Sequence, residues 1–577
     1  MSKPTISQLV VDGLVANGVT QVFGVVGDAL NSFTDAIRTT EGIDWIGVRH
    51  EEVGAFAAGA QSQITGRIGV CAGTVGPGSL HMINGLYDAA KSHTPLLAIA
   101  GQIPLGELNS DYFQEVDNDA VYDDLAVFCA TITSPEQMPR LVEQAIEAAI
   151  SQNGVAVLSV PGDIGSTEVD SRPVRTFATQ HAVAATSDVI SEAAAAIEKA
   201  DKVTLLVGIG AADARAEVLE LAERCQAPMV VTLKAKEVYD WDNPYNVGQN
   251  GLIGNPAASS AFEDCDLLVM VGTDFPYRDW FPDGTTTIQI DRAATHIGRR
   301  TAVDHGLVGD AGLTVASLNE RLTRERDSGH LDAQRAHYER WSERQAKLAE
   351  PGFDDTVLGA GRSQLDNPTH KIRPEAVAGV INRLADDDAI FTTDTGMSTV
   401  WFSRFVHMRE GQRLLGSFNL GSMANAMPQA LGAQALDRSR QVIAFAGDGG
   451  FTMLLGDLIT AVSYDLPFKI VVFDNHRLGM VKLEMEEAGL PEYGTQLANP
   501  DLAAVATAMG ATGIRITDPD DLESEIARGF AHDGPVVFDV LTNPDEIIIP
   551  SEPTPGQAWG FAISKVKEFV RSRGDED

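Results

Sequence analysis

The sequence has few cysteines, an excess of negative over positive charge, and no long apolar run. Its four cysteines contain no CxxC pair, which argues against a cysteine zinc site or a disulfide framework and fits a reducing cytoplasm. No stretch of about 18 apolar residues occurs, so no transmembrane helix is predicted. The first residues also lack the continuous apolar core of a signal peptide. We therefore expect a cytoplasmic protein.

The charge balance is strongly acidic, with 43 Lys and Arg against 81 Asp and Glu and a net charge of −38. A protein that binds a phosphate backbone needs a basic footprint, so a nucleic-acid partner is not expected. An acidic surface of this kind favours solubility and is compatible with a salty environment.

Short apolar runs alternate with helical patterns along the chain, and the pattern restarts twice. This alternation predicts parallel βαβ units. Two stretches, 172–186 and 351–370, have the composition of irregular connections, and neither short repeats nor low-complexity tracts occur. The prediction is an α/β fold with three doubly wound parallel-sheet domains. The expected boundaries are 1–175, 186–345 and 365–550, followed by a tail at 551–577.

Polar side chains follow two neighbouring strands of the third predicted domain. One strand ends in the tetrapeptide GDGG (447–450), and the next ends in Asp474 and Asn475. Ligands of open parallel sheets bind at the carboxyl ends of strands, where glycines let a phosphate approach the backbone. Carboxylate and amide oxygens suit Mg²⁺ or Ca²⁺ beside a phosphate. We therefore predict a cation on Asp448 and Asn475 that clamps a diphosphate; a ligand-free turn is the alternative for the GDG motif alone.

This motif, followed by a strand that ends in Asn, resembles the cofactor fingerprint of thiamine-diphosphate enzymes. In that family the second of two consecutive asparagines is the metal ligand, which corresponds to Asn475. The family resemblance also implies that the backbone carbonyl of Arg477 completes the protein's share of the ligands. Asp474 stands where most relatives have Asn, and it adds a carboxylate near the predicted metal.

A second candidate site lies where the predicted strand 43–48 is followed by Arg49, His50 and Glu51. The cofactor needs a carboxylate at N1′ of its pyrimidine, because this contact promotes the imino form that removes the proton from C2. The tripeptide resembles the family's Arg-His-Glu motif, which implies that Glu51 is the activating residue. Taken alone, Glu51 has an ordinary alternative as a helix-start acid, and Glu52 is expected to be a solvated acid of the first turn.

The resemblance covers nearly the whole chain. Residues 72–89 resemble the family's Gly-Pro-Gly stretch, 111–115 its substrate loop, 393–398 the loop that meets the diphosphate, and 416–433 the segment whose Met lies beneath the cofactor. It implies a pyrimidine-binding first domain and a diphosphate-binding third domain. It also implies a homodimer at least, with tetramers common, because the activating glutamate and the diphosphate site come from different subunits. The implied cofactor residues are Gly27, Gly76, Gly396, Met397, Ser398, Gly447, Gly449 and Gly450, with Met423 beneath the cofactor.

The middle domain resembles the FAD-binding domain of pyruvate oxidases in segments 249–254, 272–281 and 287–291. Segment 240–254 is similar to that of the quinone-dependent pyruvate dehydrogenase. The Gly208-x-Gly210 pair is a weak Rossmann signature, since Asp213 replaces the third glycine, and a plain βα turn is its alternative. The FAD residues implied are Gly208, Gly210, Gly251, Leu252, Thr273, Asp274, Phe275, Arg278 and Asp291, the last at a strand end suited to a ribose hydroxyl.

The resemblance implies oxidative decarboxylation of pyruvate to acetate and CO₂, with two electrons passing through FAD to a quinone or O₂. It places Phe113, Gln114 and Glu484 near the substrate, and Met480 where relatives have an aromatic residue. The alternatives are an acetolactate synthase with non-redox FAD, a phosphate-dependent oxidase that makes acetyl phosphate, a flavin-free 2-oxo acid decarboxylase, and a catalytically silent scaffold.

Residues 551–577 form a basic amphipathic pattern, with Trp559, Ile563, Val566 and Val570 at helical spacing. Such a helix suits an anionic membrane surface, which predicts peripheral contact with the inner face of the cell membrane. A last helix packed on the body is the alternative.

Overall fold

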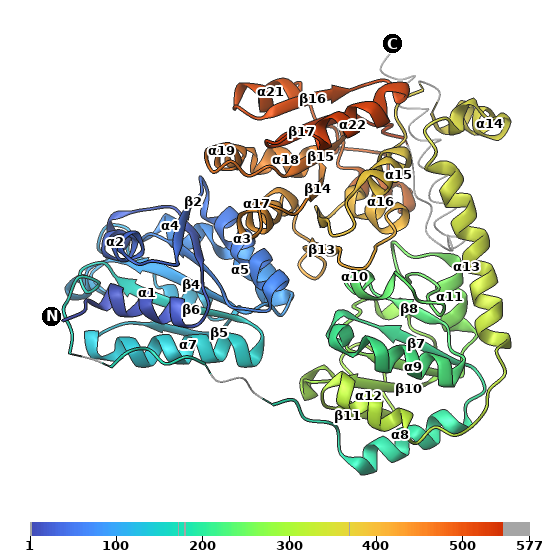
Figure 1. Ribbon diagram of the computed structural model, residues 1–577, viewed down its shortest axis with the longest axis horizontal. Coiled ribbons are helices and arrows are strands. Elements are labelled where there is room, and N and C mark those ends of the chain that lie inside the picture. Colours follow the sequence, from blue (N-terminus) through green and yellow to red (C-terminus); the bar gives the residue numbers. More distant parts are fainter. Residues whose placement is uncertain (1–2, 171, 178–180, 368–369, 546–577) are drawn as a thin grey trace.

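The structure is a computed structural model that describes residues 3–170, 172–177, 181–367 and 370–545. Within these residues the strands form three sheets of six, five and six strands, and all pairs inside the sheets are parallel. The predicted α/β fold with three parallel-sheet domains is therefore confirmed. Figure 1 shows the N-terminal domain in blue, the middle domain in green and the third domain in orange and red.

The N-terminal domain has the strand order β2-β1-β3-β4-β6-β5. Its strands are β1 Gln21–Gly24, β2 Asp44–Gly47, β3 Gly69–Gly73, β4 Leu96–Gln102, β5 Ala126–Thr131 and β6 Val155–Pro161. Its helices are α1 Ile6–Ala16, α2 Asn31–Thr39, α3 Glu51–Thr65, α4 Pro77–His81, α5 Ile83–Lys91, α6 Asn118–Tyr122 and α7 Met138–Gln152.

The middle domain has the strand order β11-β10-β9-β7-β8. Its strands are β7 Val203–Val207, β8 Met229–Val231, β9 Leu267–Val271, β10 Thr286–Asp291 and β11 His305–Val308. Its helices are α8 Ser187–Lys199, α9 Arg215–Cys225, α10 Lys236–Tyr239, α11 Pro256–Glu263 and α12 Ala311–Asn319, and the long α13 Gly329–Leu348 runs from this domain toward the third (Figure 1).

The third domain has the strand order β13-β12-β14-β15-β17-β16. Its strands are β12 Ile390–Thr393, β13 Arg413–Gly416, β14 Val442–Gly447, β15 Lys469–Asp474, β16 Thr512–Ile516 and β17 Val536–Leu541. Its helices are α14 Val357–Asp366, α15 Pro374–Leu384, α16 Met397–Phe405, α17 Ala426–Leu436, α18 Asp448–Met453, α19 Leu458–Ser463, α20 Gly479–Glu487, α21 Leu502–Ala508 and α22 Leu522–Phe530.

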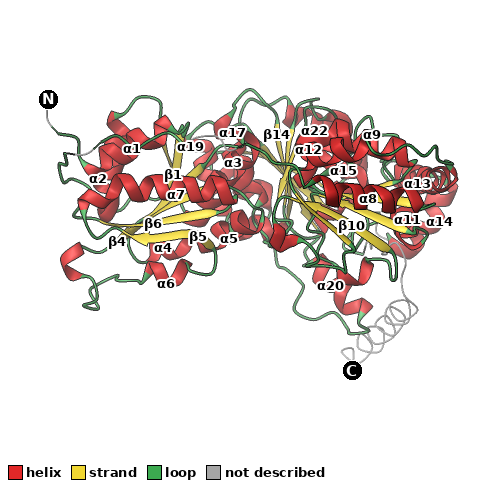
Figure 2. Cartoon of the chain, turned by 90° about the horizontal axis from the view of Figure 1, so that it is seen from below, coloured by secondary structure: helices red, strands yellow, loops and turns green. Residues whose placement is uncertain are grey.

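The inner strands are buried on both faces. Every residue of β4, β9 and β15 is buried, because helices cover both faces of each sheet, as Figure 2 shows from below. A parallel strand in this position reads as a continuous apolar run rather than an alternating one. The sequence pattern therefore predicted these three strands. It did not predict β5, whose residues are all half-buried.

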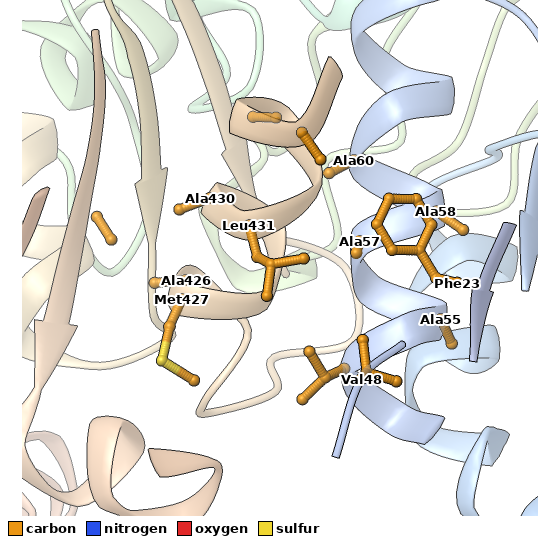
Figure 3. Packing of buried hydrophobic residues seen from close by; sticks show 14 of the residues in the cluster. Phe23, Val48, Ala55, Ala57, Ala58, Ala60, Ala426, Met427, Ala430 and Leu431 are labelled. Carbon is orange, nitrogen blue, oxygen red and sulfur yellow. The ribbon is translucent and has the colours of Figure 1, made fainter. Parts of the chain in front are cut away.

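The N-terminal and third domains pack through α3 and α17, which are built from small residues. A Cβ added at Gly432 of α17 would lie 2.3 Å from the carbonyl oxygen of Ala57 on α3. Figure 3 shows Ala57 and Ala60 of α3 facing Ala430 and Leu431 of α17. One buried apolar cluster runs through this contact into both sheets. The close packing holds the middle of α3 against the third domain.

Arg413 on β13 joins all three domains. Its guanidinium donates to the carbonyl oxygens of Gln63 and Ile64 at the end of α3, and it pairs with Glu237 of the middle domain at 3.2 Å. Glu237 also accepts a hydrogen bond from the backbone N–H of Leu414. The C-terminal end of α3 is thus held by a residue of the third domain that also binds the middle domain.

The stretch 351–370 is not irregular throughout, because residues 357–366 form α14, whose N-cap Thr356 accepts a hydrogen bond from the N–H of Gly359.

All four cysteines are free, as expected. No helix in the described part of the chain combines the length and apolar character needed to cross a bilayer. The predicted helix at 551–577 lies outside the described residues.

Candidate active site

Asp448 and Asp474 lie side by side at the carboxyl edge of the third sheet. β14 pairs with β15 so that Gly447 is level with Phe473, which puts the next residues, Asp448 and Asp474, at the same height. Asn499 links them, since its Nδ2 donates to Asp448 Oδ2 at 2.7 Å and to Asp474 Oδ1 at 2.8 Å. The two strand ends thus share one edge of the sheet, as predicted, and they bring two acids together there.

Burial makes this edge strongly receptive to a cation. Asp448 and Asp474 are both almost fully buried, and Asp474 Oδ2 has no hydrogen-bond partner among the described residues. Burial, and then the charge of Asp474, raises the pKa of Asp448. The same two causes raise the pKa of Asp539, which lies on the adjacent strand β17. Buried carboxylates that repel one another are stabilised by a bound cation.

The predicted ligands that follow β15 are engaged locally. Asn475 Oδ1 accepts a hydrogen bond from the backbone N–H of Arg477 at 2.9 Å, and the Arg477 side chain pairs with Glu492. The N–H of Leu478 donates to the carbonyl of Thr495, so the segment after α20 folds back over this turn. Across the described residues, no three or more His, Cys, Asp or Glu side chains are grouped to hold a metal. The predicted metal ligands are not a group of this type, because they comprise one carboxylate, one side-chain amide and one backbone carbonyl.

Glycines leave open space beside these acids. A Cβ added at Gly447 or Gly396 would have no atom within 4 Å, and Gly396 has a φ of 142° that favours glycine. At Gly449 an added Cβ would lie 3.2 Å from Cε of Met423. The open space and the bordering methionine suit the diphosphate and the body of the predicted cofactor.

The loop after β12 converges on the same edge. A Cβ added at Gly479 would lie 2.9 Å from Cγ of Met397 and 3.2 Å from Nδ2 of Asn475. The hydroxyl of Ser398 donates to the carbonyl of Asp394. The structure therefore brings the predicted loop 393–398 to the predicted metal ligands.

Sequence reasoning missed Asp394 and Asn499. Asp394 is buried, its Oδ1 accepts the N–H of Ala426 at 2.8 Å, and its Oδ2 has no hydrogen-bond partner within the described ranges. Burial raises the pKa of Asp394 to about 7. A Cβ at Gly450 would lie 2.3 Å from Asp394 Oδ2, which explains this glycine by packing. Asp394 carried a signal similar to that of Asp448, since it is an acid that directly follows a buried strand.

Glu51 opens α3 and is 6% exposed. Its Oε2 lies 2.9 Å from Nδ1 of His81 at the end of α4, and the ring of His50 stacks on His81 with centroids 4.6 Å apart. A Cβ at Gly78 would lie 3.1 Å from Glu51 Oε1. The Gly-Pro-Gly stretch therefore packs against Glu51, and His81 is a site residue that sequence reasoning missed although it lies within the quoted stretch.

The expectation that Glu52 is solvated is wrong. Its side chain is 18% exposed, and its Oε1 accepts a hydrogen bond from Nδ2 of Asn84 at 2.7 Å. Asn84 also donates to the hydroxyl of Ser422, the residue before Met423. Glu52 therefore belongs to the contact between the N-terminal and third domains.

The predicted substrate loop lies beside the Gly-Pro-Gly turn. Phe113 is 80% exposed, and Gln114 has a φ of 65°. A Cβ at Gly76, whose φ is 67°, would lie 3.0 Å from Cβ of Gln114. A Cβ at Gly27 would collide with the hydroxyl of Thr74 at 2.2 Å. The predicted residues Gly27, Gly76 and Gln114 thus gather at the carboxyl edge of the N-terminal sheet.

In the middle domain, close backbone packing accounts for two predicted glycines. The N–H of Gly208 donates to the carbonyl of Val271, and that of Gly210 to the carbonyl of Gly272. A Cβ at Gly208 would lie 2.3 Å from that Gly272 oxygen. The turns after β7 and β9 need glycine for this approach, whether or not a phosphate also binds there.

The other predicted FAD residues line the carboxyl ends of β9 and β10. Thr273 Oγ1 accepts the N–H of Phe275, and Asp274 pairs with Arg299 and Arg300. Arg278 donates to the carbonyl of Arg299.

Asp291 lies at the same edge and is already engaged. It accepts the N–H of Ala293 and lies 3.2 Å from Nδ1 of His296, and the ring of His296 meets His93 of the N-terminal domain. This carboxylate is therefore held in place by its own turn.

The predicted flavin segments meet the predicted substrate side. A Cβ at Gly251, whose φ is 93°, would lie 3.1 Å from the ring of Phe275 and 3.3 Å from that of Tyr277. Burial, and then the charge of Glu484 on α20, raises the pKa of Tyr277. Leu252 follows in the same segment and is half-buried, whereas Met480, one turn before Glu484, packs against the core of the third domain.

Comparison with known proteins identifies each domain. Residues 4–121 match the description "Thiamine pyrophosphate enzyme, N-terminal TPP binding domain", residues 190–318 match its central domain, and residues 394–540 its C-terminal TPP binding domain.

Several relatives match over nearly the whole chain. A Bacillus subtilis protein named as thiamine pyrophosphate-containing, YdaP, is 38% identical over 99% of this chain and 97% of its own length. The pyruvate oxidase of Lactiplantibacillus plantarum is 28% identical over 93% of this chain and 88% of its own. The acetolactate synthase large subunit of Parasynechococcus marenigrum is 31% identical over 95% and 89%.

Proposed function

The chain belongs to the thiamine pyrophosphate enzyme family, and we propose that it oxidises pyruvate to acetate and CO₂ with FAD as the electron carrier. The proposal combines the cofactor site at the third sheet, the activating glutamate of the N-terminal domain and the flavin segments of the middle domain. Each part is supported by separate observations.

The residues at the edge of the third sheet fit thiamine diphosphate and Mg²⁺. When bound, this cofactor supplies an electron sink for the carbon that loses CO₂. Asp448, Asn475 and the carbonyl of Arg477 would hold the cation, and the open space at Gly396 and Gly447 would admit the diphosphate. The buried, unpaired oxygen of Asp474 supports a cation at this position.

Glu51 would hold a proton at N1′ of the pyrimidine. Its Oε2 is fixed by His81 and its Oε1 faces Gly78, so the carboxylate has a defined direction at the helix start. A buried carboxylate at this place is suited to general acid–base chemistry.

A second copy of the chain is part of the proposal. Exposed apolar side chains flank both half-sites: Val26, Leu80 and Phe113 at the edge of the N-terminal sheet, and Met453, Val481, Leu490 and Tyr493 at that of the third sheet. Exposed apolar patches of this kind mark interaction surfaces. We infer that the two edges face one another across a homodimer, which can pair further into a tetramer.

The single observation that favours an oxidoreductase is the packing of Tyr277 and Phe275 around Gly251, where burial and then the charge of Glu484 raise the pKa of Tyr277. The family resemblance puts Glu484 near the substrate, and Tyr277 packs with Phe275 against Gly251 in the predicted flavin segment. Pyruvate and water would give acetate, CO₂, two protons and two electrons, and FAD would take the electrons. A flavin beside the substrate side makes this transfer direct, and one relative is named pyruvate oxidase.

An acetolactate synthase is the second candidate, since relatives of that name reach 31% identity over nearly the whole chain. Such an enzyme joins two pyruvate molecules with loss of one CO₂, and its flavin has no redox role. Flavin absorbance therefore separates the two candidates.

The test mixes protein loaded with thiamine diphosphate, Mg²⁺ and FAD with pyruvate under anaerobic conditions. We expect the flavin band to bleach in step with CO₂ release, and quinone or O₂ to restore it. Phosphate added in a parallel reaction tests for acetyl phosphate in place of acetate. Oxidised flavin that persists while acetolactate accumulates would reject the proposal. Glu51→Gln is the matched control, and it should bind the cofactors without bleaching the flavin.

A further inference from the structure

The turn that precedes Glu51 is held by a buried acid from the third domain. The carboxylate of Asp457 accepts the backbone N–H of Arg49 on Oδ1 at 2.8 Å and that of His50 on Oδ2 at 3.1 Å. Asp457 ends the short turn 455–457 just before α19, and it is 1% exposed. Thus two consecutive N–H groups directly before Glu51 bind one carboxylate from a distant part of the chain.

A second side chain of the same segment extends this contact. The hydroxyl of Tyr464 accepts the N–H of Gly47, the last residue of β2, at 2.7 Å. Because β2 is the edge strand of its sheet, its outward backbone groups need partners from elsewhere. Tyr464 binds the N–H of Gly47, and Asp457 binds the N–H groups of Arg49 and His50.

The chemistry of the contact suits a positioning role. Hydrogen bonds from N–H groups to a carboxylate are shorter and stronger than neutral ones, and two of them on one carboxylate fix direction as well as distance. Thr460 donates a third bond to Asp457 Oδ1 at 2.7 Å and so holds the carboxylate in place. His50 is the N-cap of α3 and Glu51 its first residue, so the orientation of this turn sets the direction of the Glu51 side chain.

We propose that Asp457 is a positioning residue for Glu51, holding the Arg49–His50 turn so that the Glu51 carboxylate points at the cofactor pyrimidine. The proposal rests on the role given to Glu51 above, but not on pyruvate, FAD or the electron acceptor. It makes the third domain part of the apparatus that activates the cofactor, in addition to the metal and diphosphate ligands it carries.

Simple domain attachment does not require Asp457. The α3–α17 packing, the bonds of Arg413 to Gln63 and Ile64, and the Asn84–Ser422 bond hold the same two domains together at other places. Loss of Asp457 should therefore leave the domains docked and act on the direction of Glu51. A measurement that reports on activation of the cofactor separates this role from a structural one.

The experiment measures exchange of the thiazolium C2 proton for deuterium in full-length protein loaded with thiamine diphosphate and Mg²⁺, without substrate. We expect Asp457→Ala to slow exchange about tenfold or more, because small misplacements of a reacting group are costly. Asp457→Asn, which keeps one acceptor, should fall between Ala and the unchanged protein. Asp518→Asn is the matched control, since Asp518 also accepts a backbone N–H, from Asp520, on the exposed surface of the third domain.

Glu51→Gln calibrates the test. If it slows exchange strongly while Asp457→Asn and Asp457→Ala exchange at the unchanged rate with cofactor bound, the inference about Asp457 is overturned and the role of Glu51 stands. If Glu51→Gln itself exchanges normally, the proposed role of Glu51 is overturned and Asp457 has nothing to position. Should Asp457→Ala not fold, Asp457→Asn decides: slowed exchange at a melting temperature close to that of the unchanged protein supports the inference, and unchanged exchange rejects it.

Discussion

The carboxylates of Asp448 and Asp474 share one hydrogen-bond donor, the Nδ2 group of Asn499, at 2.7 and 2.8 Å. This amide holds two buried acids together at the end of neighbouring strands. Burial, and then the charge of Asp474, raises the pKa of Asp448, and a divalent cation would relieve the same repulsion. Asn499 therefore explains how the chain accommodates two buried aspartates at this edge.

Replacing Asp474 with Asn should stabilise the metal-free protein at pH 8. The change removes a buried negative charge next to Asp448. Each kcal/mol added to the free energy of unfolding raises the melting temperature by about 2–4 °C. Melting curves with and without Mg²⁺ test this, and the gain on adding Mg²⁺ should be larger for the unchanged protein. Asp388→Asn, at an exposed acid of the same domain, is the control. An Asp474→Asn protein that melts lower without Mg²⁺ would contradict this account.

Asp88 predicts a pH dependence of stability. It is buried between α5 and α17, accepts a hydrogen bond from Gln429, and has its pKa raised from 3.8 to about 6, chiefly by burial. The folded state thus binds a proton that the unfolded state has lost, so stability falls as pH rises from about 4 through 6, by about 3 kcal/mol at most.

The Asp88→Asn variant tests this directly. Its melting temperature should exceed that of the unchanged protein at pH 8, and the difference should shrink toward pH 5. Because the comparison is made between two proteins at each pH, other titrating groups cancel. A difference that does not vary with pH would show that the Asp88 carboxylate is not the cause.

Glu115 should control substrate affinity through the loop that carries Phe113 and Gln114. Its carboxylate accepts the N–H groups of Asn109 and Tyr112, and these backbone bonds, that of Asn109 foremost, lower the pKa of Glu115. We expect Glu115→Ala to raise the KM for pyruvate on the order of tenfold, because the loop loses its fixed shape. Steady-state kinetics measures this, with Glu107→Gln as control. An unchanged KM would show that this loop does not contribute to substrate binding.

Gly432→Ala should loosen the contact between α3 and α17. The new methyl group would meet the Ala57 carbonyl at 2.3 Å, and overpacking of this kind costs about 1–3 kcal/mol. We expect a lower melting temperature and faster proteolysis between the domains. Gly361→Ala, on α14 with open space around it, should be neutral or slightly stabilising. Equal stability of the two variants would argue against close packing at Gly432.

Salt should stabilise the protein. A net charge of −38 makes the folded chain repel itself, and salt screens charges beyond about 10 Å at 0.1 M ionic strength. The melting temperature should rise by several degrees between low and molar NaCl. Sucrose at matched osmolality is the control, because it acts by exclusion from the surface and not by screening. A melting temperature that does not depend on NaCl would show that the surface charges are already balanced locally.

The sequence determined the three parallel sheets and the chemistry at their edges. Buried strands such as β4 and β15 require continuous apolar runs, and an acid that directly follows such a run must lie at a sheet edge. This reasoning located Asp448 and Asp474, because neighbouring parallel strands end at the same edge. Glu51 was visible for a related reason, as the first residue of a helix that follows a strand.

Only the tertiary structure decided which distant residues complete these sites. Asn499, His81 and Asp457 lie far along the chain from the residues they bind, and a hydrogen bond between separate segments leaves no periodic pattern in a sequence. The docking of α3 on α17, which depends on the shape of two helix surfaces at Ala57 and Gly432, then sets how the turn before Glu51 is held by the third domain. Local periodicity reports burial, whereas the partner of a buried polar atom is chosen by the packing of whole domains.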